Sequence, residues 1–298
     1  MTPFSTDFST TAALTEAFAH YSKPSNLTPE LSCSLRWRQG KLWVSAFSPA
    51  GSIPLPALAS EEWFRACLMR SQAQAVIIDP ELGDASINLW LKACEEAGKP
   101  VYLKIPSMAS LPQKKKPLAW WVKGVCDRIV AALFLLLLSP LLPIFIGLMK
   151  LQGNSPVFDT RWHIGERGKL FRVLRCHVNE ADVCKTKANA LTSVVEKVLK
   201  STLNAALQLL NILRGEMSLV GPRALTVHEA LEVTSDLRHR LNALPGITGT
   251  WQLKQLEQQN HFVVSQQDLK YLEEWTVLHD LKLLLLSMSR VLTRAAYF

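Results

Sequence analysis

The first third of the chain alternates between short apolar runs and helical patterns. These patterns predict a β-hairpin over residues 35–47, a helix over 60–72, a strand over 74–78, a helix over 84–98 capped by Asp84, and a strand over 101–105. We expect them to form a small α/β domain over 31–106 with a right-handed crossover. Residues 1–30 are rich in Ser and Thr, and we expect them to be poorly ordered apart from a short helix around 12–20. No glycine-rich phosphate loop follows the strands, so we expect the domain to serve regulation or protein interaction.

The longest apolar run covers residues 129–149, which include no charged side chain. Its length suits a helix that spans a membrane. However, Ser139-Pro140 lies near its centre and Pro143 follows, and proline removes a helical hydrogen bond and bends the helix. Basic residues flank both ends, so charge defines no inside and outside. We therefore expect a re-entrant membrane helix that enters one leaflet and returns. A full span and a buried soluble helix are the alternatives.

A basic linker is predicted over residues 107–118, ahead of a second domain over 119–298. The linker includes the three lysines 114–116, and Trp120 and Trp121 follow it. Lysine and tryptophan are typical anchors at the surface of an anionic lipid bilayer. We therefore expect membrane lipid to be a partner of this part of the chain.

The positive charge of the chain is concentrated in its second part. Residues 1–110 carry 9 Lys and Arg against 10 Asp and Glu, and residues 111–298 carry 24 against 15, which together give the net charge of +8. An anionic partner of the second part is therefore predicted. Nucleic acid is not expected, because the charge flanks an apolar segment and no recognition motif accompanies it. The six cysteines show no CxxC pair, which indicates reduced thiols. We expect no signal peptide, because the N-terminus lacks a basic segment followed by an apolar core.

A long helix is predicted to end at Gly215 and to lead into the loop Gly221-Pro222-Arg223. This loop suits a phosphate group. The motifs LNILRGEMSLVGPR, IGERGKLFRVLR, PGITG and D-x-x-Y-x-x-x-W-x-x-x-x-D (268–280) occur in the order and spacing of the bacterial sugar transferases. The chain resembles this family over about residues 117–298. The extra N-terminal domain and the Thr-Trp-Gln after PGITG resemble the heterocyst-development and exopolysaccharide members of cyanobacteria.

The resemblance implies a mainly helical, mixed α/β transferase domain with a re-entrant helix, at the inner (cytoplasmic) membrane with its soluble domains facing the cytoplasm. Such enzymes move a sugar 1-phosphate from a UDP-sugar to polyprenyl phosphate at the start of exopolysaccharide or lipid-linked glycan synthesis. In them an aspartate attacks the β-phosphorus and a neighbouring glutamate helps to hold Mg²⁺. Aspartate is a plausible nucleophile toward phosphorus, and cations must screen two anionic substrates.

The chain departs from the family at this catalytic pair. The resemblance places Asn204 at the position of the aspartate and Ala205 at that of the glutamate, and Leu207 replaces a helix-kinking proline. Asparagine has no anionic oxygen and alanine offers no metal ligand. Orthodox covalent catalysis, transfer by another route, and a non-catalytic partner or regulator of glycan assembly are the three alternatives, and Mg²⁺ is expected only for an active enzyme.

Other candidate residues follow from the same resemblance. Those for phosphate or substrate are Gly221, Pro222, Arg223, His163, Lys169, Arg175 and His177. The two histidines bind phosphate only when protonated, and otherwise each is an ordinary polar group of the surface or core. Asp268 and Asp280 match acids of the family and are the candidates for a metal. Glu216 also matches a family acid, so we do not expect it to substitute for the missing pair.

Overall fold

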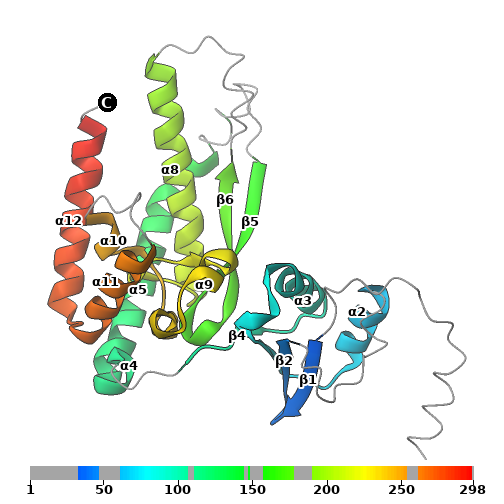
Figure 1. Cartoon of the computed structure of the whole chain (residues 1–298). Helices are drawn as coiled ribbons and strands as arrows, with labels where there is room; N and C mark the ends of the chain where they lie inside the picture. Colours follow the sequence, from blue (N-terminus) through cyan, green and yellow to red (C-terminus); the bar gives the residue numbers. More distant parts are fainter. Residues whose placement is uncertain are drawn as a thin grey trace, which may run out of the picture.

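The computed structural model describes residues 33–46, 61–106, 111–143, 147, 157–177, 190–253 and 261–296. The chain folds into mixed helices and sheets, with a small α/β part beside a larger part in which long helices stand next to the strands (Figure 1). The predicted segment 1–30, including its helix, lies outside the described residues.

The N-terminal sheet has the order β1 (Cys33–Arg38), β2 (Lys41–Ala46), β3 (Ala75–Ile78), β4 (Val101–Leu103). β1 and β2 form the predicted hairpin, and Gln39 and Gly40 both adopt the positive φ that a tight two-residue turn requires. The other neighbours are parallel. Helices α2 (Glu61–Arg70) and α3 (Asp84–Glu96) confirm the two predicted helices. The predicted cap is wrong, because Asp84 is the first residue of α3 and Gly83 occupies the cap position.

The second part contains two further sheets and a layer of helices. One sheet has the order β6 (Leu170–His177), β5 (Val157–Ile164), β8 (Leu225–Thr226), and the other pairs β7 (Ser218–Val220) with β9 (Gly246–Thr248). Its long helices are α5 (Pro117–Leu138), α8 (Ala190–Leu213), α11 (His261–Glu273) and α12 (Val277–Ala296). Its short helices are α4 (Pro112–Lys115), η4 (Glu166–Gly168), α9 (Val227–Glu232), η5 (Ser235–Asn242) and α10 (Thr250–Leu253). The N-terminal part has one further short helix, η3 (Pro80–Leu82). Helix α8 lies along the edge strand β6 (Figure 1).

The predicted linker 107–118 is partly folded. Helix α4 forms inside it, and Leu111 is buried in an apolar cluster with Leu272 and Trp275. The lysines 114–116 are exposed, as expected of a basic surface segment. Buried side chains from both sides of the linker, including Leu103 and Leu225, belong to one apolar cluster. The division of the chain into two domains therefore stays a prediction.

The helix that contains the start of the apolar run has other bounds than the predicted 129–149. Helix α5 starts twelve residues earlier, at Pro117, and ends at Leu138, immediately before Ser139-Pro140. Pro140 has no N–H to donate to the Leu136 carbonyl, and the Ser139 hydroxyl donates to that oxygen instead, at 2.8 Å. Within the described ranges, none of the helices has the length and apolarity needed to cross a membrane. The re-entrant helix stays a prediction.

The segment 268–292 is amphipathic and strongly apolar, which suits either the membrane surface or the core, and of these two we expect core packing. In the structure it is divided between α11 and α12, which meet at a break over residues 274–276. The core packing that we favoured is confirmed for Tyr271, Leu272 and Leu283, which are buried. Other apolar side chains of α12 are exposed, including Leu278 and Leu285. One side of this helix therefore closes the core, and other apolar side chains of the same helix are left on the surface.

Candidate functional site

Helix α8 ends at a glycine in the left-handed conformation, as its sequence predicts. Gly215 has φ +75°, its N–H donates to the Ile212 carbonyl at 2.9 Å, and the Glu216 N–H donates to the Asn211 carbonyl at 2.9 Å. This pair of bonds is the Schellman motif. A Cβ atom added at Gly215 would lie 2.5 Å from Nη2 of Arg128. The guanidinium of Arg128 therefore lies at the negative end of the α8 dipole, where a cation is stabilising.

The loop Gly221-Pro222-Arg223 packs directly against the PGITG segment. The Gly221 N–H donates to the Thr248 carbonyl at 3.0 Å, and the Gly246 N–H donates to the Pro222 carbonyl at 2.9 Å. A Cβ atom added at Gly221 would lie 2.6 Å from the Leu244 carbonyl oxygen, so a larger residue would push the two backbones apart. This close contact fixes the position of Arg223.

Arg175, Arg223 and His163 meet at a cavity of about 90 Å³, which we call the arginine pocket. Gln208 of α8 and Trp251 of α10 also line it. Nη2 of Arg223 pairs with Oε1 of Glu229 at 2.9 Å. The indole N–H of Trp251 is buried and finds no acceptor among the described residues. The pocket is therefore positively charged and has an additional donor, and it has room for one phosphate-sized group.

His163 supports Arg175 from behind. Its ring is fully buried, and burial lowers its pKa to about 4, so it is neutral near pH 7. Nδ1 lies 3.0 Å from the Arg161 carbonyl, which makes Nδ1 the donor and leaves Nε2 to accept from Nη2 of Arg175 at 3.3 Å. Of the two readings of this histidine, a protonated phosphate ligand and a polar core group, the structure favours the second.

Burial and the neighbouring Arg161 lower the pKa of Arg175, while Glu229 raises it. Two more arginines therefore lie close enough to Arg175 to repel it, namely Arg161 and Arg223. An anion bound in the arginine pocket would relieve this repulsion, since opposite charges within a few ångströms favour each other. The electrostatics of the pocket thus favour a phosphate or carboxylate as its occupant.

Asn204 is bonded to the edge strand. Its Oδ1 accepts the backbone N–H of Cys176 on β6 at 2.6 Å. Asn211, seven residues further along the same face of α8, donates to the Arg172 carbonyl of β6 at 2.8 Å. The two asparagines therefore satisfy backbone groups at the open edge of the sheet. The single oxygen of Asn204 is engaged in this bond, and Ala205 is exposed.

Asp268 is fully buried below the Gly-Pro-Arg loop. It bonds the Arg240 guanidinium, accepts the backbone N–H of Arg223 at 3.1 Å, and accepts from the Thr250 hydroxyl at 3.4 Å. Burial raises its pKa to about 6, against the lowering effect of Arg240. Asp268 therefore holds the backbone of Arg223 in place.

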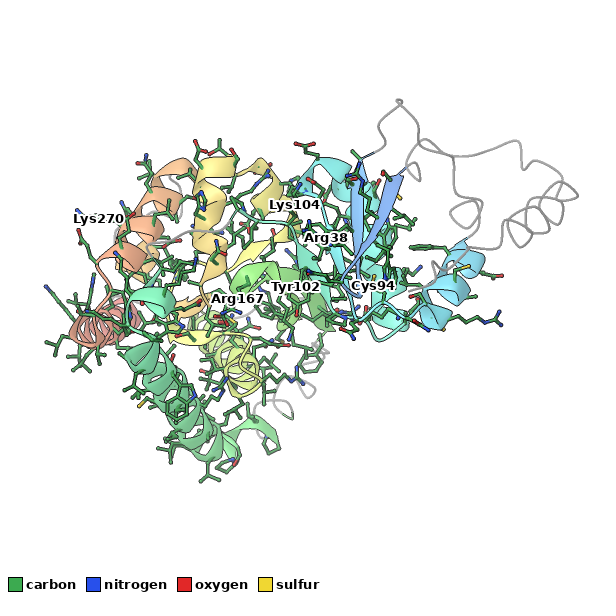
Figure 2. The ribbon with its side chains drawn as sticks, turned by 90° about the horizontal axis from the view of Figure 1, so that it is seen from below. Arg38, Cys94, Tyr102, Lys104, Arg167 and Lys270 are labelled. Atoms are coloured by element: carbon green, nitrogen blue, oxygen red, sulfur yellow. The ribbon has the colours of Figure 1, made fainter. Side chains whose placement is uncertain are left out.

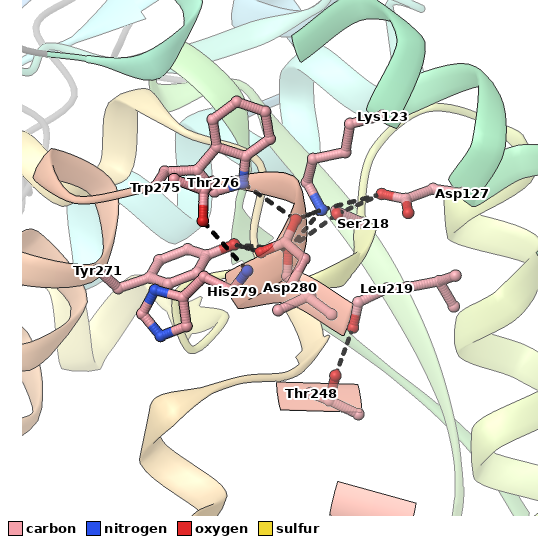
Figure 3. Close-up of polar contacts among 11 residues, drawn as sticks. Lys123, Asp127, Ser218, Leu219, Thr248, Tyr271, Trp275, Thr276, His279 and Asp280 are labelled. Atoms are coloured by element: carbon pink, nitrogen blue, oxygen red, sulfur yellow. Dashed lines mark hydrogen bonds and ion pairs between the residues drawn. The ribbon is translucent and has the colours of Figure 1, made fainter. Parts of the chain in front are cut away.

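Asp280 lies in a second cluster, which we call the Lys123 network (Figure 3). The Lys123 ammonium is 2.7 Å from Oδ2 of Asp280 and 3.4 Å from Oδ2 of Asp127. The Tyr271 hydroxyl donates to Asp280 at 2.6 Å and the Trp275 indole N–H at 3.0 Å. The Ser218 hydroxyl donates to Asp127. Every charge of this network therefore has partners inside the protein.

The residues predicted for a metal do not fit Mg²⁺. Donors already occupy both oxygens of Asp268 and of Asp280, and the two carboxylates belong to separate clusters. Across the described ranges, no group of three or more His, Cys, Asp or Glu side chains could hold a metal ion. The methyl side chain of Ala205 offers no metal ligand.

Two other predicted residues lie elsewhere. Lys169 is exposed and its backbone forms a bridge with Tyr102 of the N-terminal sheet, in a different cavity from the arginine pocket. His177 is the last residue of β6, opposite Val157, and its side chain is outside what the structure describes. Sequence reasoning missed Gln208 and Trp251. The spacing of Asn204, Gln208 and Asn211, which places all three on one helical face, was the available signal.

The sequence model of the bacterial sugar transferase family matches residues 118–294. The chain belongs to this family. It is 30% identical over 205 residues to the exopolysaccharide production protein ExoY of Sinorhizobium fredii. This match covers 61% of this chain and 91% of ExoY. It is 30% identical over 186 residues to the UDP-glucose:undecaprenyl-phosphate glucose-1-phosphate transferase of Caulobacter vibrioides, covering 57% of this chain and 70% of that protein.

A third relative is the undecaprenyl-phosphate galactose phosphotransferase of Salmonella typhimurium, at 27% identity over 196 residues. This match covers 58% of the chain but only 41% of the relative. The part matched by the family model begins at residue 118, after the N-terminal sheet. The narrower resemblance to cyanobacterial members stays a prediction.

Proposed function

We propose that this protein is a membrane-associated, phosphate-binding and non-catalytic member of its family that acts in glycan assembly and forms no covalent sugar-phosphate intermediate at position 204. Its ligands on this proposal are polyprenyl phosphate and a UDP-sugar, the substrates that the names of its relatives indicate. One observation carries the proposal: the only oxygen of Asn204 accepts the Cys176 N–H at 2.6 Å. The one side-chain oxygen is therefore neutral and already hydrogen-bonded, which makes it a poor nucleophile toward phosphorus.

The arginine pocket supports the proposal that the protein still binds the phosphate groups of these ligands. Arg175, Arg223 and the indole of Trp251, whose N–H has no acceptor in the described part of the chain, converge on a space that accommodates one phosphate. Phosphate recognition by arginine depends on such convergent donors. A protein can thus keep its affinity for the substrates while it lacks the reacting pair.

Exposed apolar helix faces support an association with membrane lipid. Leu133, Leu136 and Leu137 on α5 are each more than half exposed, as are Leu278, Leu281 and Leu285 on α12. An apolar face that the protein core does not cover is stabilised by insertion between lipids. The exposed lysines 114–116 at the start of α5 suit anionic headgroups. We place the protein at the cytoplasmic face of the inner membrane.

The second candidate function is sugar-phosphate transfer by another route, and the intact arginine pocket favours it. One experiment separates the two. Wild-type protein and the double variant Asn204→Asp/Ala205→Glu are incubated in membranes with polyprenyl phosphate, Mg²⁺ and a panel of UDP-sugars, and UMP release is measured. We expect no release from the wild type and Mg²⁺-dependent release from the double variant.

The reason lies in the bond to Cys176. A carboxylate at position 204 accepts the same N–H with one oxygen and keeps the second for attack, and the glutamate supplies a metal ligand. The single variant Asn204→Asp is the matched control, because it restores the nucleophile without the ligand. UMP release by the wild-type protein would overturn the non-catalytic proposal and support transfer by another route.

A further inference from the structure

The sheet of the N-terminal part has one face that the two described helices, α2 and α3, do not cover. Val44 and Ile78 point to the face that packs under α2 and α3, and both are buried. Alternation along the strands places Trp43, Ile77 and Tyr102 on the opposite face. The strand register makes these three residues direct neighbours across β2, β3 and β4. They form a half-exposed aromatic and apolar row.

This row lines a cavity of about 830 Å³, which we call the junction cavity. Its other walls come from the transferase part and include Gly165, Arg167 and Glu216. In Figure 2, Tyr102, Lys104 and Arg167 lie at the junction between the two parts of the chain, while Lys270 lies on the far side of the molecule. The volume is within the range of sites for cofactors and other small ligands.

The junction cavity is rich in cations. Its five basic side chains are Lys41, Lys104, Lys114, Arg167 and Lys169, against two carboxylates, Glu166 and Glu216. Lys104 also pairs with Asp79 at 2.6 Å, so one of the five is compensated from outside the lining. Oε1 of Glu166 accepts from Gln113. Burial raises the pKa of Glu166, against the lowering effects of Arg167 and of the hydrogen bond from Gln113. The balance favours an anionic occupant.

An unsatisfied donor marks the same place. The indole N–H of Trp43 is buried and finds no acceptor in the described part of the chain. Buried polar groups almost always have a partner, so a ligand or water is expected to accept from this N–H. The aromatic faces of Trp43 and Tyr102, the buried donor and the cations together match a ligand with both a planar ring and phosphate groups.

We propose that the junction cavity binds a nucleotide, with its base against Trp43 and Tyr102 and its phosphates near Arg167 and Lys169. This site is separate from the arginine pocket and does not depend on the proposed function. Glu216 connects the two regions, because its carboxylate accepts from Asn211 on α8 at 2.9 Å. A bound nucleotide is therefore in a position to influence the helix that presents Asn204.

The test is isothermal titration calorimetry on the full-length protein in lipid nanodiscs. The probe is ADP, and adenosine and pyrophosphate are titrated separately as the base alone and the phosphates alone. We expect ADP to bind, and each fragment to bind at least about tenfold more weakly because it makes only half of the contacts. No binding of ADP at about 1 mM, or pyrophosphate binding as tightly as ADP, would overturn the proposal.

Variants locate the site. Arg167→Gln keeps the size of an exposed side chain and removes its charge, and we expect it to weaken ADP binding about tenfold. Trp43→Phe keeps a ring and removes the orphan N–H, and we expect a smaller loss. Lys270→Gln, an exposed cation outside the cavity, is the matched control and should change affinity less than about twofold. Equal losses in Arg167→Gln and Lys270→Gln, or a loss in Arg223→Gln, would show that ADP binds elsewhere.

Discussion

The Lys123 network and the arginine pocket are both built from charged residues of the matched family region, but their charges are balanced in opposite ways. In the Lys123 network one ammonium lies between two carboxylates, and Ser218, Tyr271 and Trp275 supply further donors to these oxygens. In the arginine pocket two guanidinium groups converge on an open space, and the Trp251 N–H has no acceptor among the described residues.

This difference separates two roles for charge. The Lys123 network joins α5, β7, α11 and α12, and its charged groups form ion pairs and hydrogen bonds with one another. We call such a cluster closed. An open cluster with excess positive charge is costly until an anion arrives, which is typical of a binding site. The same contrast explains why Asp280 is a poor metal candidate while Arg223 is a good phosphate candidate.

The largest expected effect comes from breaking the closed cluster. Lys123→Met removes the cation and leaves Asp127 and Asp280 buried without it. Removing one partner of a buried ion pair costs about 3–5 kcal/mol in the free energy of unfolding. Urea unfolding measures this loss, and Lys270→Met, on the surface, is the control. A loss equal to that of the control would mean that the network is not structural.

The second effect is a dependence on pH. Folding lowers the pKa of His163 from 6.5 to about 4, so between these values the unfolded chain binds more protons than the folded one. Stability is therefore lost as the pH falls, by about 2 kcal/mol between pH 7 and pH 5. His163→Gln should remove this part of the slope in urea unfolding at several pH values. The exposed His228→Gln is the control, and an unchanged slope in His163→Gln would contradict the assignment of a buried neutral ring.

The third effect concerns the open cluster, where we expect lost affinity with little lost stability. Arg223→Gln removes one guanidinium from the arginine pocket, and we expect phosphate-bearing ligands to bind about tenfold more weakly, or 1.4 kcal/mol. Binding of a UDP-sugar, measured by calorimetry, tests this. The control is Arg238→Gln, whose guanidinium donates to the Val233 and Leu231 carbonyls and does not line the pocket. A similar loss in both variants would point to a general charge effect.

The smallest effect is at the edge of the sheet. Asn204→Ala leaves the Cys176 N–H without its acceptor, which should cost about 1 kcal/mol in the free energy of unfolding. Asn204→Asp keeps the acceptor and should cost less. Urea unfolding of the two variants side by side decides the matter, and an Asp variant less stable than the Ala variant would show that position 204 does not tolerate a charge.

Local patterns predicted the elements of the N-terminal sheet well. Alternation around Gln39-Gly40 gave the hairpin, and the glycine at 215 gave the end of α8, because both depend on neighbouring residues and on backbone conformation. The start of α5 was predicted wrongly: the helix begins at Pro117, twelve residues before the predicted position 129. Charge suggested a linker there, but tertiary packing of Leu111 and Lys123 overrides the local preference.

The candidate site divides in the same way. Motif spacing identified Arg175, Arg223 and His163, and the structure brings these three to one pocket. Lys169 was grouped with them but lies in the junction cavity, because the turn of η4 directs the chain toward the N-terminal sheet. A sequence cannot show which of two cavities an exposed lysine faces.

The amino-acid sequence by itself determined the family and the helix that ends at Gly215, because motifs and residue identities are local properties of the chain. Tertiary structure was needed to learn that His163 is neutral, that Asp280 is paired with Lys123 and that Asn204 bonds the edge of β6. Protonation states and hydrogen-bond partners depend on burial and on groups far apart in the chain, and only folding brings these together.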